Sequence, residues 1–100
     1  MSQVSIQFGN NKGQSGQDIN TNVSVSPNGQ DQKVSTLLAN TNVGQSGSVS
    51  YIQLVSNFQA VTVVVKTHGQ TIATLNANTT YKDLGSAVRI NDLVIHVTST

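Results

Sequence analysis

Side chains able to carry acid–base or metal chemistry are few in this chain. It contains two His, four Asp and five basic residues, and neither Glu nor Cys occurs. We interpret His68 as a solvated turn residue and His96 as a surface or interface residue, because a zinc-type site needs three or four converging ligands. The aspartates all lie in or beside predicted loops, and no Gly-x-Ser-x-Gly nucleophile motif is present. We therefore expect no catalytic residues and no enzymatic activity.

A calcium loop is the alternative interpretation of residues 18–22. Their sequence, Asp-Ile-Asn-Thr-Asn, places oxygen ligands at alternate positions, as the start of such a loop does. The next residue should be Gly, but it is Val23, and the bidentate Glu that closes the loop is missing. Alternating polar residues are equally typical of an exposed strand. We expect an exposed strand face here, with neither metal nor cofactor bound.

The charge balance also restricts the possible partners. A formal net charge of +1, with only 9% charged residues, gives no basic patch for nucleic acid or an anionic membrane. Carbohydrate binding stays open as the alternative function, because Asn, Gln and Thr side chains can hydrogen-bond sugar hydroxyls. A sugar site usually also stacks an aromatic ring, and this chain has no Trp and four Phe and Tyr residues together.

Uncharged polar surfaces favour contact with other proteins. Asn, Gln, Ser and Thr make up 44 of the 100 residues, and burying them avoids the desolvation of ions. We predict a structural or assembly subunit that contacts itself or another structural protein as a homo-oligomer. The favoured version is a virion component of a capsid, decoration or tail.

The N-terminal residues 1–17 are the candidate assembly arm, a short strand followed by a flexible Gly-rich loop. Its candidate contact residues are Phe8, Asn10, Asn11, Gln14 and Gln17. No secretory signal is visible, so the expected location is a virion, or else the cytoplasm or a non-classical export route.

The elements that would position these residues are β-strands. Val, Ile and Thr reach 31 residues, whereas strong helix formers are scarce. Turn signals recur at intervals of roughly 8–12 residues, as in an all-β sandwich or barrel. The prediction is a small antiparallel β-sandwich or partly open barrel of about seven to eight short strands, with residues 18–100 as its single domain.

Two hairpins are predicted in the C-terminal half. Residues 60–67 and 70–75 flank His68-Gly69, a two-residue loop ending in Gly that suggests a type I′ turn. This loop would place Val65 opposite Ile72 in a central hairpin. Residues 86–90 and 93–97 flank Asn91-Asp92 as a second two-residue turn.

Between these hairpins, residues 78–85 are expected to form one helical turn capped by Thr79 or Thr80. The predicted core is Val61, Val63, Val65, Ile72, Val88, Ile90, Leu93, Ile95 and Val97.

The N-terminal half has a weaker pattern. Residues 4–8, 19–26 and 49–56 alternate between apolar and polar side chains and are predicted strands. Pro27-Asn28-Gly29 is a turn signal, because Pro fixes φ and Asn-Gly accepts positive φ. The following residues 33–40 are a predicted strand, with a short helix around residues 37–39 as the alternative.

Overall fold

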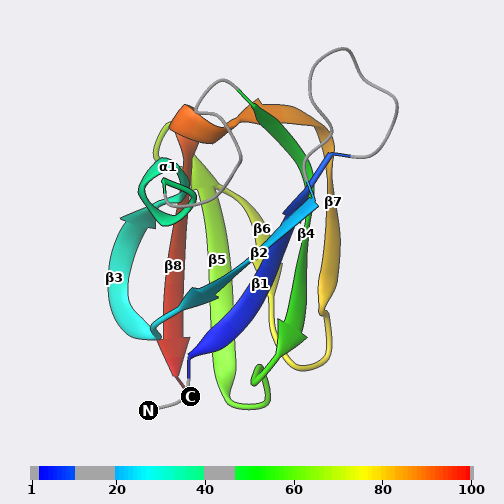
Figure 1. Cartoon of the computed structure of the whole chain (residues 1–100). Coiled ribbons are helices and arrows are strands. Elements are labelled where there is room, and N and C mark those ends of the chain that lie inside the picture. The colour runs from blue at the N-terminus through cyan, green and yellow to red at the C-terminus, as the bar shows by residue number, and fades with distance from the viewer. Residues whose placement is uncertain (1–2, 11–19, 40–46, 100) are drawn as a thin grey trace.

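The structure is a computed structural model that describes residues 3–10, 20–39 and 47–99 (Figure 1). Eight strands form two four-stranded antiparallel sheets, which confirms the predicted β-sandwich. We call the sheet with strand order β2-β1-β4-β7 sheet A, and the sheet with order β3-β8-β5-β6 sheet B. The strands are β1 (Val4–Gly9), β2 (Asn20–Val25), β3 (Asn28–Lys33), β4 (Ser48–Ser56), β5 (Val61–Thr67), β6 (Gln70–Leu75), β7 (Tyr81–Arg89) and β8 (Leu93–Ser99).

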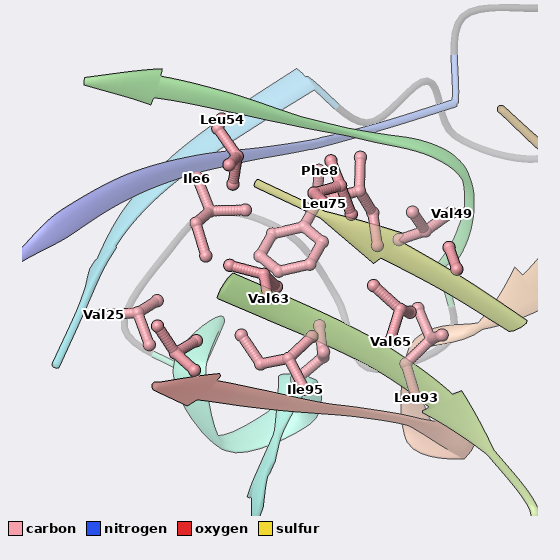
Figure 2. Close-up of a cluster of buried hydrophobic side chains, with 14 of the residues drawn as sticks. Ile6, Phe8, Val25, Val49, Leu54, Val63, Val65, Leu75, Leu93 and Ile95 are labelled. Carbon is pink, nitrogen blue, oxygen red and sulfur yellow. The ribbon is translucent and has the colours of Figure 1, made fainter. Parts of the chain in front are cut away.

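The hydrophobic core lies between the two sheets (Figure 2). Side chains such as Ile6 and Phe8 from β1 meet Val63 from β5 and Ile95 from β8. Buried residues alternate with partly buried ones along these strands, so each strand turns one face inward. Seven of the nine predicted core residues are buried: Val61, Val63, Val65, Ile90, Leu93, Ile95 and Val97. The other two, Ile72 and Val88, are partly buried and pack against this core.

The first predicted hairpin is confirmed, with a correction to its register. His68 has φ 52° and Gly69 φ 78°, as the type I′ turn requires. Thr67 pairs with Gln70 as expected, but a register shift then places Val65 opposite Ala73 and not opposite Ile72. The shift is a bulge on β6 that turns Ala73 and Leu75 into the core. The hairpin is also not central, since β6 is an edge strand of sheet B.

The second predicted hairpin is wrong. β7 pairs with β4 in sheet A, whereas β8 pairs with β3 and β5 in sheet B. The connection, a 3₁₀ turn over Ile90–Asp92, therefore carries the chain from one sheet to the other. Ile90 and Leu93 are both fully buried, because the chain passes across the end of the core at this point.

The predicted helical turn at residues 78–85 is also wrong. Asn76 and Thr79 form an isolated antiparallel bridge, and the Asn76 side chain accepts hydrogen bonds from the N–H groups of Asn78 and Thr79. This tight turn leads straight into β7, so Tyr81–Leu84 is extended. Between Val88 and Asp83, β7 departs from regular pairing with β4.

In the N-terminal half, all three predicted strands are present as β1, β2 and β4. The segment after Pro27 forms β3, where only a turn was predicted. After β3 the chain forms the helical alternative, but the four-residue helix α1 (Val34–Leu37) lies earlier than the expected residues 37–39. None of the helices in the described ranges is long and apolar enough to span a membrane.

Candidate functional site

Two of the five residues of the predicted assembly arm, Phe8 and Asn10, lie in the described part of the chain, and both are buried. Phe8 is 0% exposed and belongs to the core, because it shares the inward face of β1 with Val4 and Ile6. Asn10 is also buried, at 2%. Asn11, Gln14 and Gln17 lie outside the described residues. The strand of the arm is thus an inner strand of sheet A, paired with β2 on one side and β4 on the other.

Three ionisable side chains meet on the outer face of sheet B. Asp31 on β3 lies opposite His96 on β8, and its Oδ1 is 2.8 Å from His96 Nδ1. Lys66 Nζ, from β5, lies 3.3 Å from the same oxygen. The hydrogen bond from His96, and then the one from Lys66, hold the pKa of Asp31 below its ordinary value of 3.8. This cluster joins three strands through one exposed carboxylate.

The other predicted single-residue sites are separate from this cluster. His68 is 77% exposed at its turn, as expected, and its Nε2 is 3.9 Å from Asp92 Oδ2. Within the described ranges, no three His, Cys, Asp or Glu residues come together in a way that could hold a metal ion. Asp18, the first residue of the calcium alternative, lies outside those ranges, whereas Asn22 is exposed on β2.

The outer face of sheet A is very different from that of sheet B. The register aligns Asn22, Gln7, Gln53 and Tyr81 in one row across β2, β1, β4 and β7. Directly opposed residues in antiparallel strands share a face, so these four side chains stand side by side. Ser24, Ser5 and Ser56 form a second, parallel row over three strands. We call this surface the sheet A face.

A third row brings Gly9 opposite Tyr51, and Tyr51 opposite Asp83. A Cβ atom added to Gly9 would collide with the Tyr51 ring, so the missing side chain is what lets this ring lie against the backbone of β1. Tyr51 is consequently only 6% exposed although it belongs to an outer face. Burial, with a smaller contribution from Tyr81, raises the pKa of Tyr51 above its ordinary value of 10.0.

Tyr51 in turn supports Tyr81. The ring centroids lie 5.5 Å apart and the ring planes are inclined by 25°, which is a stacked pair. Tyr81 is 47% exposed, so the side of its ring away from Tyr51 is in contact with solvent. An aromatic surface is thus formed on three neighbouring strands by Gly9, Tyr51 and Tyr81.

The edges of the two sheets differ in how well they are protected against pairing with another strand. Natural edge strands are commonly protected by charges or bulges. β3 carries Asp31 and Lys33, β7 carries Lys82, Asp83 and Arg89, and β6 has the bulge at Ile72. Of the four edge strands in the described part of the chain, β2 alone has neither device, since it pairs with β1 in unbroken register over six residues and contains no charge.

The fold and these surfaces define the class of the molecule, a small two-sheet antiparallel β-sandwich with Asn, Gln and Ser rows on one outer face and the Asp31, His96 and Lys66 cluster on the other. No family model, curated protein or solved structure matches the chain.

Sequence reasoning missed the tyrosine pair. Tyr51 and Tyr81 are 30 positions apart, and four scattered aromatics suggested no common surface. One signal was available, namely Gly9 at the end of an otherwise alternating strand. A glycine there often marks a place where another group approaches the backbone closely.

Proposed function

We propose that this protein is a non-enzymatic structural subunit that assembles by strand addition at β2. The observation that carries the proposal is the unprotected edge of β2, which is regular, uncharged and six residues long. A second strand could continue sheet A there through main-chain hydrogen bonds, as in other cases of β-augmentation. The side chains brought together would be hydroxyls and amides, so no ion would need to be desolvated.

The partner is a second copy of this chain or another structural protein. Within this proposal we favour a particle component, such as a capsid, decoration or tail subunit of a virion. Support for this finer statement comes from the composition: an uncharged polar chain with a small core gains burial when it assembles.

The test is the mass of the protein in solution by light scattering over a wide range of concentration, with electron microscopy of the assembled material. Ser24→Lys places a charge on the exposed side of β2 and should shift the protein toward the monomer. The matched control, Gln30→Lys, adds the same charge to an exposed position of β3 and should leave the mass unchanged.

A charge-pair experiment identifies the strand that is added. If two β2 strands pair, mixing Ser24→Lys with Ser24→Glu should restore the assembled mass, because opposite charges across paired strands attract. A wild-type protein that is strictly monomeric at high concentration would refute the proposal. Equal effects of the β2 and β3 substitutions would remove β2 as the contact.

A further inference from the structure

We propose that the exposed ring of Tyr81 is a stacking platform for a neutral oligosaccharide, with Gln53 and Gln7 as its hydrogen-bonding neighbours. This inference goes beyond the assembly function and uses a different part of the molecule. In sheet A, β7 is the edge strand opposite β2, so a strand added at β2 leaves Tyr81 uncovered.

The platform is held in place before any ligand arrives. Tyr51 fixes the orientation of the Tyr81 ring through the stacked contact, and Tyr51 is itself held against Gly9. A rigid aromatic ring loses little conformational entropy when it binds a ligand, which favours affinity. The solvent-facing side of Tyr81 offers a flat apolar area, which matches the C–H face of a pyranose ring.

The neighbouring side chains supply the polar half of such a site. Gln53 lies directly opposite Tyr81, and Gln7 lies opposite Gln53 on the next strand. Each amide offers donors and an acceptor, which suits hydroxyl groups that both donate and accept hydrogen bonds. From Tyr81 to Asn22 the row crosses three strand spacings, or about 14 Å, which is long enough for more than one sugar ring.

Charge selects among the possible ligands. Asp83 is the charged residue of the outer side of sheet A that lies beside the tyrosine pair, whereas Arg89 lies opposite Ser48 at the other end of β7. Nucleic acid, sulfated glycans and uronic acids carry anionic groups that would need cations here and would be repelled by Asp83. The surface therefore fits an uncharged glycan.

The experiment measures binding of defined oligosaccharides to the intact chain by calorimetry and by saturation-transfer NMR. The neutral probes are cellohexaose, xylohexaose and maltohexaose, and trigalacturonate is the anionic comparison. Three variants are compared with the wild type: Tyr81→Ala, Tyr81→Phe, and the control Thr74→Ala on the exposed outer side of β6. Tyr81 is half exposed, so its replacement should leave the fold intact, and circular dichroism checks this.

We expect at least one neutral probe to bind, and to bind more tightly than trigalacturonate. Tyr81→Ala should weaken this binding about tenfold or more, whereas Tyr81→Phe keeps the ring and the affinity. The proposal is overturned if no neutral probe binds, or if Tyr81→Ala binds as well as Thr74→Ala. It is also overturned if Tyr81→Ala lowers the mass of the unliganded protein, because the face is then occupied by a second copy. The Ser24 variants test assembly independently of all these outcomes.

Discussion

Gly9→Ala should destabilise the protein because of one side chain on the neighbouring strand. Replacing Gly by Ala within a strand ordinarily stabilises by roughly 0.5–1 kcal/mol, since Gly loses more backbone entropy on folding, and Gly9, although the last residue of β1, is paired on both sides. Here the new Cβ would occupy the space of the Tyr51 ring. The new Cβ meets the far end of the Tyr51 ring, so this ring must move away from β1 and become more exposed to solvent.

The size of the effect follows from the area involved. A Tyr side chain buries about 150–250 Å², and at about 25 cal/mol per Å² its full exposure would cost about 4–6 kcal/mol. Tyr51 is 6% exposed, so nearly all of this burial is at stake. If the displaced ring loses about half of its cover, the net loss is about 2 kcal/mol after the backbone gain. For a domain of this size that lowers the Tm by about 8–16 °C.

The assay is a double-mutant cycle by thermal and urea unfolding with Gly9→Ala, Tyr51→Ala and the double variant. Without the Tyr51 ring the collision disappears, so Gly9→Ala should become neutral or slightly stabilising. The coupling free energy should be about 2–3 kcal/mol, near the upper end found for residues in contact. Because the chain has two Tyr and no Trp, near-ultraviolet circular dichroism also reports on the stacked pair directly.

An absorbance titration gives an independent readout. The pKa of Tyr51 is raised mainly by burial, so it should fall toward its ordinary value when Gly9→Ala displaces the ring. A raised pKa in the folded state means that stability is present below pH 10 and is lost as the pH rises through the folded value. Equal effects of Gly9→Ala in the presence and absence of the Tyr51 ring would refute the close-contact argument.

Three other substitutions test the core, the charged cluster and a buried hydroxyl. Val65→Asp should unfold the domain by burying an unpaired charge, whereas Val64→Asp, one residue away on the half-buried outer side, should leave it folded by circular dichroism. Asp31→Asn should be less stable than the wild type at neutral pH, because the hydrogen bond from His96 stabilises the ionised Asp31 carboxylate and so lowers its pKa. Urea titrations should show this difference vanishing as the pH falls below 3.8, and a difference independent of pH would contradict the argument. Ser50→Ala should raise the free energy of unfolding by up to about 1 kcal/mol, because the buried Ser50 hydroxyl has no hydrogen-bond partner in the described structure. A lower Tm for this variant would contradict the prediction.

The sequence predicts the fold class well because alternation and turn chemistry are local. Both positive φ values at His68 and Gly69 follow from the spacing of two apolar strands around a two-residue turn. The bulge at Ile72 does not follow, although it decides that Leu75, rather than Thr74, enters the core. The bulge is favourable because it buries the Leu75 side chain, and that gain depends on the side chains of the opposite sheet.

The 3₁₀ turn over Ile90–Asp92, which forms an arch between the two sheets, shows a second limit of prediction from local sequence patterns. Two apolar strands joined by a short polar turn fit a hairpin within one sheet and an arch between two sheets equally well. The choice depends on pairing with distant strands, here β4 for β7 and β5 for β8. The same limit hides the tyrosine pair, since its members become neighbours only through the β4–β7 register.

The uncharged polar residues of this chain have a definite spatial order. Asn, Gln and Ser form rows across β2, β1 and β4 of sheet A, whereas Asp31, Lys66 and His96 share the opposite outer face. A sandwich with no surface function would gain nothing from separating the two kinds of residue, because scattered charges alone maintain solubility. Keeping ions away from these rows matters when they must lose water to a neutral partner, as ion desolvation opposes such contacts. This segregation is the reason to look for the partner on sheet A, at the β2 edge for another chain and at Tyr81 for a sugar.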